Sequence, residues 1–185
     1  MNKNKLLTLW FKITLASFLC LFIYVFFSAV LIAPIAAIPI VWLANLVLSL
    51  VLAAIFSVIL IMLQYKKNQQ GEKIFWDDFP EGVNYSVVDD VKKILAREKP
   101  VFMIVSAIIT LALLAILIDE LLQVNALSGV FLIYSPLFSF FSLFDGLPLF
   151  FELTLGFAFS CFATNAVYIA VTVLLHKKWY KKFRG

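Results

Sequence analysis

The sequence predicts an all-α protein, a polytopic transmembrane four-helix bundle with a cytoplasmic amphipathic helix and a partly membrane-embedded outer loop. Of its 185 residues, 64% are hydrophobic and only 14% are charged, against about 45–50% apolar and about 25% charged in soluble domains. The apolar residues gather in runs as long as the ~20 residues that one helix needs to cross hydrocarbon. Lipid is therefore the expected solvent for most of the chain, and the length predicts a single membrane domain, 1–185.

The first two spans form one long apolar stretch, in which Lys12 is the only charged residue between Leu6 and Leu63. Pro34 and Pro39 interrupt it, because each removes a backbone donor and disfavours helix in the residue before. The stretch therefore predicts a helical hairpin. Its expected parts are a span near 8–32, a turn at 33–38 and a span near 39–63.

The second half of the chain alternates polar and apolar segments. The expected order is a cytoplasmic loop at 65–100, a third span near 101–118, an outer loop at 119–148 and a fourth span near 149–175. Within the outer loop, 126–148 is apolar and rich in Phe, but Gly129, Pro136 and Gly146 interrupt it. Hydropathy alone leaves this part as a fifth span, a re-entrant segment or a helix in the membrane interface.

The placement of basic residues decides the number of spans. All fifteen Lys and Arg lie in 3–12, 66–99 and 177–184, whereas 119–152 contains acidic residues and no basic ones. Under the positive-inside rule the three basic regions share the cytoplasmic face, and a fifth span would carry the tail outside. We therefore predict four spans in a bacterial inner membrane, with both termini in the cytoplasm.

Small and polar residues recur at every fourth position on two of the spans. This spacing places them on one helix face, and small residues let helices approach closely in lipid. We expect these two stripes to mediate helix packing or self-association into a homo-oligomer. They comprise Asn45, Ser49, Ala53 and Ser57 on the second span, and Gly156, Ser160 and Thr164 on the fourth.

Catalytic and metal-binding groups are not predicted. An intramembrane enzyme needs paired acids, a serine with a histidine, or zinc ligands within a span, and the sequence places none there. His176 lies at the membrane edge beside a lysine pair, and Cys20 and Cys161 lie in apolar stretches that favour simple packing. We expect no enzyme activity, no metal, no cofactor and no direct contact with nucleic acid.

The cytoplasmic loop carries the strongest indication of an interaction. Its first part interleaves aromatic with acidic residues, and its second part predicts an amphipathic helix of about three turns. The apolar stripe of that helix could rest on the membrane surface, pack on the ends of the spans, or bind a partner protein. The acidic residues argue against simple adsorption to anionic lipid. We predict that a soluble cytoplasmic protein docks here, on Phe75, Trp76, Asp77, Asp78, Phe79, Val87, Val91 and Ile94.

In size and four-span layout the chain resembles the membrane subunit of the Kiwa antiphage defence system, a likeness of length and hydropathy over the whole chain. The resemblance implies an oligomer that detects phage at the envelope and works with a cytoplasmic DNA-binding partner. We therefore expect a small oligomeric membrane subunit that anchors or signals to a cytoplasmic partner through 65–100, and the resemblance implies that it is the membrane sensor of a prokaryotic antiviral defence system. The alternatives are an oligomeric channel or membrane-perturbing protein, and a membrane protein that handles lipids or small molecules.

Overall fold

The computed structural model describes residues 3–28, 30, 34–35, 37–64, 87–122 and 127–184, and within these ranges the chain contains helices and no strand. The elements are α1 (Lys3–Phe26), α3 (Val41–Gln64), α4 (Val87–Leu122), α5 (Leu127–Val130), the 3₁₀ helices η1 (Leu132–Leu137) and η2 (Ser139–Leu143), and α6 (Leu149–Arg184). Four helices are long and apolar enough to cross a membrane. These spans are Leu6–Phe26, Val41–Gln64, Glu98–Asp119 and Phe151–Leu175. The predicted fold class, an all-α polytopic membrane bundle, is confirmed.

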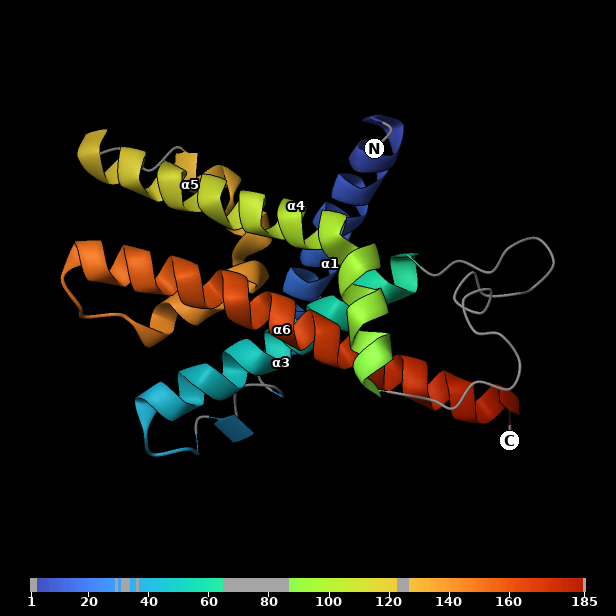
Figure 1. The fold of residues 1–185 in the computed structure, drawn as a ribbon. Coiled ribbons are helices and arrows are strands. Elements are labelled where there is room, and N and C mark those ends of the chain that lie inside the picture. Colours follow the sequence, from blue (N-terminus) through green and yellow to red (C-terminus); the bar gives the residue numbers. More distant parts are fainter. Residues whose placement is uncertain are drawn as a thin grey trace.

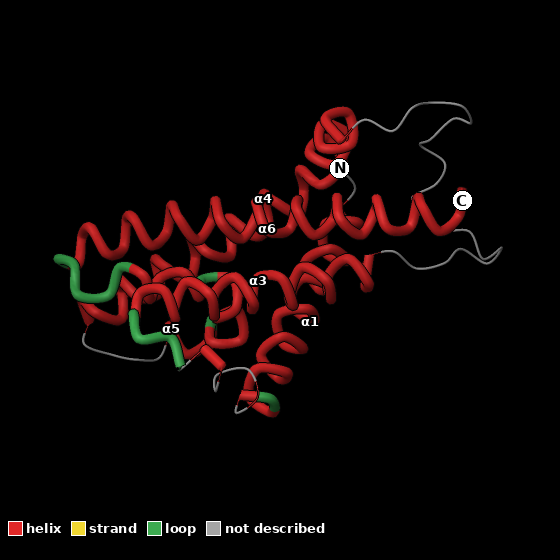
Figure 2. Tube along the Cα trace, turned by 90° about the horizontal axis from the view of Figure 1, so that it is seen from below, coloured by secondary structure: helices red, strands yellow, loops and turns green. Residues whose placement is uncertain are grey.

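Three of the spanning helices run alongside one another, and the fourth crosses them. Figure 1 shows α3, α4 and α6 extending along the bundle, whereas α1 runs across them at a steep angle. Seen from below in Figure 2, nearly all of the described chain is helical. The main helix pairs are α4 with α6, α1 with α3, and α3 with α6.

The interior and the surface of the bundle are both apolar. The largest fully buried side chains come from all four spans and include Ile13, Phe56, Ile109 and Tyr168. Large apolar side chains also cover the outside, among them Phe11, Phe26, Met62, Met103 and Phe162. In water so much exposed apolar surface would drive aggregation, whereas in lipid it is the expected surface of a helix bundle. The chain is thus an integral membrane protein.

The first helix ends earlier than the expected span at 8–32. Its α-helical range stops at Phe26, after which the Phe27 amide still donates to the Ile23 carbonyl at 2.9 Å. The Val30 amide donates instead to the Phe27 carbonyl, three residues back, at 3.0 Å. This tighter bond marks an interruption at Phe27. Ser28, Val30, Pro34 and Ile35 are again helical, so the helix is interrupted before Pro34 and the expected turn at 33–38 contains helical residues.

The predicted amphipathic helix and the third span are one continuous helix, α4, with Pro100 inside it. Proline cannot donate to the carbonyl four residues back and crowds that carbonyl, so a helix that continues through a proline is bent there. Figure 1 shows α4 changing direction between its first turns and the rest of its length. The helix therefore carries residues 87–97 beyond the apolar span as a helical extension.

A second extension lies at the same end of the bundle. Helix α6 has 36 residues, of which Phe151–Leu175 forms the apolar span. At 1.5 Å per residue, 176–184 projects about 13 Å past that span, and 87–97 of α4 projects about 16 Å. Figure 1 shows the first turns of α4, the last turn of α3 and the last turns of α6 at one end of the bundle.

Candidate functional site

The outer loop folds back into the bundle. Its two 3₁₀ helices, which we call the inserted segment (Leu132–Leu143), contact α1, α3 and α6. Leu137 and Phe140 are completely buried, and Tyr134 and Leu143 nearly so. Residues 119–148 were expected to form an outward-facing, partly embedded cap, and the structure resolves the embedded part as a segment enclosed by helices.

The tyrosine of the inserted segment is bonded to α1 through a closed set of hydrogen bonds. Trp10 Nε1 donates to the Tyr134 hydroxyl at 3.2 Å, and the hydroxyls of Tyr134 and Thr14 lie 2.8 Å apart. Thr14 in turn donates to the Trp10 carbonyl at 3.1 Å. Because the hydroxyl proton of Thr14 goes to the Trp10 carbonyl, the Tyr134 hydroxyl donates to Thr14 Oγ1. The indole of Trp10 and the hydroxyls of Thr14 and Tyr134 therefore all have hydrogen-bond partners.

Side chains of α3 and α6 satisfy backbone carbonyls of the inserted segment. Ser49 Oγ donates to the Ser139 carbonyl at 3.0 Å, and Asn45 Nδ2 donates to the Ser142 carbonyl at 3.4 Å. From the other side, Thr164 Oγ1 donates to the Leu137 carbonyl at 2.9 Å. Such partners are needed because hydrocarbon offers no water to non-helical backbone, so irregular backbone occurs at membrane depth only where protein surrounds it.

Most residues of the two small-residue stripes lie against the inserted segment. Besides the three hydrogen-bonding residues, Ala53 packs with Phe140 and Leu143, and Gly156 lies against the ring of Phe141. The remaining two members, Ser57 and Ser160, are completely buried. Every residue of the two stripes except the half-buried Asn45 is thus buried within a single chain, so contacts between copies would have to use other faces.

The depth of the inserted segment follows from its partners. Thr164 lies near the midpoint of the span Phe151–Leu175, so Leu137 reaches about mid-depth. Ser139 and Ser142 contact residues progressively nearer the start of α3. The chain then turns at Gly146, whose φ of 92° suits glycine, and enters α6. The segment therefore enters and leaves the bundle at one end, as a re-entrant segment does.

A second buried polar group lies near the opposite end of the bundle. The Tyr168 hydroxyl is 3.0 Å from Glu98 Oε2 and 3.1 Å from Gln64 Oε1, which joins α6 to α4 and α3. Glu98 is only 5% exposed and Tyr168 only 1%. We call this group the Tyr168 cluster. Sequence reasoning missed it because Glu98 was assigned to the loop 65–100, although a tyrosine inside an apolar run was a signal that a polar partner is near.

The predicted docking residues lie largely outside what the structure describes. Phe75, Trp76, Asp77, Asp78 and Phe79 fall outside the described residues. Val87, Val91 and Ile94 lie in the first turns of α4, where the helix is described and these side chains are not. The docking prediction thus stays a prediction.

The polar groups of the described residues are mainly engaged in hydrogen bonds between elements. In the described ranges, no group of three or more His, Cys, Asp or Glu side chains is placed to hold a metal ion. Cys20 and Cys161 are both free thiols, and Cys20 is buried with its sulfur 3.5 Å from the Leu52 carbonyl. The site thus consists of a segment held in place by hydroxyl and amide donors.

The fold and its inserted segment define the class of protein, a small polytopic helical membrane protein with a re-entrant segment. No family model, curated protein or solved structure matches the chain.

Proposed function

We propose that this chain is a small membrane subunit that acts by contact, anchoring or signalling to a soluble cytoplasmic protein through 65–100. The observation that carries the proposal is the continuity of α4 from Val87 to Leu122. A partner bound to the first turns of this helix would hold the same helix that continues, bent at Pro100 (Figure 1), into the membrane.

The Tyr168 cluster attaches helix α4 to the bundle at a defined point. Glu98 begins the apolar span of α4 and is buried against Tyr168 of α6. On the preceding turns, Lys92, Leu95 and Ala96 are exposed and leave a face open for a partner. A displacement of this extension would therefore act first on the bond between Glu98 and Tyr168.

The packing disfavours the channel alternative. A pore formed where several copies meet along their Ser and Asn faces needs those faces free, but the inserted segment covers them. Phe140 and Phe144 also pack edge-to-face on Phe159, with ring centroids 5.8 and 5.7 Å apart, and fill the space beside α6. A channel would require the inserted segment to withdraw and break its bonds to Ser49 and Thr164.

The same proposal includes three further properties. They are self-association, a bacterial inner-membrane location with cytoplasmic termini, and a role as an antiviral sensor. Their support is the likeness in length and four-span layout to the Kiwa membrane subunit, and the confinement of basic residues to 3–12, 66–99 and 177–184. A defence role predicts that deleting the gene sensitises the native host to phage, and unchanged plaque counts would contradict it.

A photo-crosslinking pair tests the docking proposal. A photoreactive residue at the exposed Lys92 should give an adduct of fixed mass with a soluble protein in the native host, whereas one at the exposed span residue Met103 should not. Replacing Phe75, Trp76 and Phe79 by Ala should remove the Lys92 adduct and leave membrane insertion intact. Adducts that survive this replacement, or adducts only with the chain itself, would contradict docking on the loop.

A further inference from the structure

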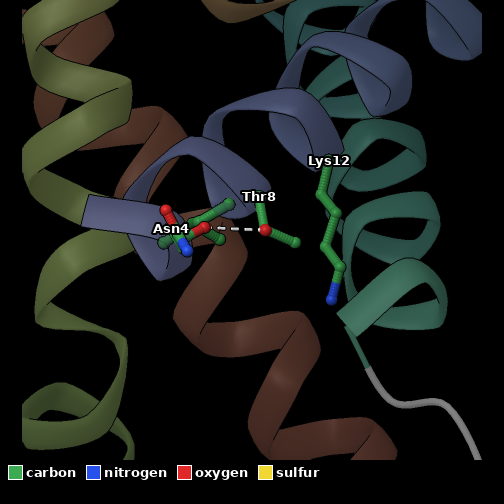
Figure 3. A pocket seen from close by; sticks show the side chains of 4 residues that line it. Asn4, Thr8 and Lys12 are labelled. Atoms are coloured by element: carbon green, nitrogen blue, oxygen red, sulfur yellow. Dashed lines mark hydrogen bonds between the residues drawn. The ribbon is translucent and has the colours of Figure 1, made fainter. Parts of the chain in front are cut away.

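A cavity of about 320 Å³ opens beside the first turns of α1 and is lined by Asn4, Thr8, Leu9 and Lys12. The three polar residues are spaced four apart, so they share one face of the helix. Figure 3 shows their side chains lying together around the cavity. Among the described residues that line it none is acidic, and they combine a cation with neutral polar groups.

Lys12 is the unusual member of this face. It lies about 9 Å along the helix from Leu6, the start of the apolar span, and it is only half-buried. Figure 3 shows its side chain reaching away from α1 toward the last turn of α3. Within the described ranges, however, the Lys12 ammonium makes no hydrogen bond or ion pair, whereas charged groups inside spans are normally paired.

The other polar groups continue from Lys12 toward the end of the helix. Thr8 Oγ1 donates to the Asn4 carbonyl at 2.8 Å, and both side chains are exposed. Exposure thus increases from the half-buried Lys12 to Thr8 and Asn4, so the charged residue is the deepest of the three polar groups, while Leu9 adds an apolar wall. A membrane phospholipid has the matching order, with acyl chains deepest, then the phosphate, then the polar headgroup.

We propose that this face, Asn4, Thr8 and Lys12, binds the phosphate of an anionic phospholipid, with the Lys12 ammonium as its ion-pair partner. The position of Lys12 favours a lipid over a free anion, because its long side chain can reach from inside the span to the interface, where the bilayer itself supplies phosphates. The preference for anionic lipid follows from the cation and from the lack of any acid among the described lining residues. This site is independent of the docking proposal, since it lies on a different helix and needs no partner protein.

Native mass spectrometry of the purified full-length protein, with phosphatidylglycerol or phosphatidylcholine added, measures this preference. We expect the wild type to retain phosphatidylglycerol about fivefold more than phosphatidylcholine, the factor that one basic residue provides near an anionic surface. Lys12→Met should reduce the ratio to about one, and Lys12→Arg should keep most of it. The matched control is Lys99→Met, which removes an exposed charge at the start of the apolar span of α4 and should leave the ratio unchanged.

Three results would overturn the assignment. Equal lipid ratios for wild type and Lys12→Met would mean that Lys12 only extends to the membrane surface or toward the end of α3. If Lys99→Met reduced the ratio of phosphatidylglycerol to phosphatidylcholine as much as Lys12→Met does, the lipid would be attracted to the basic protein in general and not to this site. Displacement of phosphatidylglycerol by inorganic phosphate, together with phosphate binding to delipidated protein, would identify a soluble anion as the ligand.

Discussion

The contact between Gly156 and Phe141 gives the sharpest test of the inserted segment. A methyl group added at Gly156 would lie 2.8 Å from Phe141 Cδ1, 2.9 Å from Cε1 and 3.1 Å from Cγ. Ordinary carbon contacts lie at about 3.5–4.0 Å, so Gly156→Ala overpacks this site. The ring cannot retreat freely, because it packs edge-to-face on Phe138 with centroids 6.5 Å apart.

Two opposing free-energy contributions determine how Gly156→Ala changes the stability of the protein. Overpacking typically costs about 1–3 kcal/mol, and replacing a helical glycine by alanine regains about 1 kcal/mol. Gly156→Ala alone should therefore lower the unfolding free energy by up to about 2 kcal/mol. In a Phe141→Ala background the clash is gone, so the same substitution should stabilise the protein by up to about 1 kcal/mol.

Reversible unfolding in mixed micelles, followed by tryptophan fluorescence, measures all four members of this double-mutant cycle. The expected coupling energy is about 1–3 kcal/mol, within the range for residues in contact. Gly129→Ala is the matched control, because no atom lies within 4 Å of its added methyl group. If the effect of Gly156→Ala is the same with and without the Phe141 ring, the inserted segment does not lie against α6 as described.

Two further predictions concern the same packing. Tyr134→Phe removes the acceptor of Trp10 and the donor to Thr14, so it should cost about 1 kcal/mol of unfolding free energy, measured in the same micelles. Tyr24→Phe is its control, because no hydrogen bond of that hydroxyl occurs among the described residues, and equal losses in the two variants would contradict the proposed bonds. A small membrane-permeant maleimide should modify the half-buried Cys161 in the folded protein and the buried Cys20 only after denaturation, as peptide mass spectrometry would show. Rapid modification of Cys20 in the folded state would mean that α1 does not pack on α3 as found.

The four spanning helices could be predicted from sequence because each depends mainly on local composition. A run of apolar residues long enough to cross hydrocarbon forms a helix whatever its neighbours are. The small-residue stripes could also be located, since their spacing is a property of one helix. What covers the stripes could not be predicted, because the bond from Ser49 to the Ser139 carbonyl joins residues 90 positions apart.

Pro100 and Glu98 both occupy positions in the fold that differ from the prediction. The predicted change from the loop 65–100 to the span near 101–118 falls at Pro100, yet α4 continues through it, since a proline in a long helix bends it when tertiary contacts hold both sides. One such contact is the bond from Tyr168 to Glu98. That bond depends on how α4 and α6 pack, and the charge of Glu98 had placed it in the polar loop.

The most direct test of the re-entrant segment is its sidedness. Single cysteines at Leu121, Asp145 and Lys92, all exposed positions, are introduced into a cysteine-free chain and treated with a membrane-impermeant maleimide. In intact cells the cysteines at 121 and 145 should both react, and the one at 92 should react only in inverted vesicles. If the cysteines at 121 and 145 react from opposite sides, the segment between them crosses the membrane, and the four-span account is contradicted.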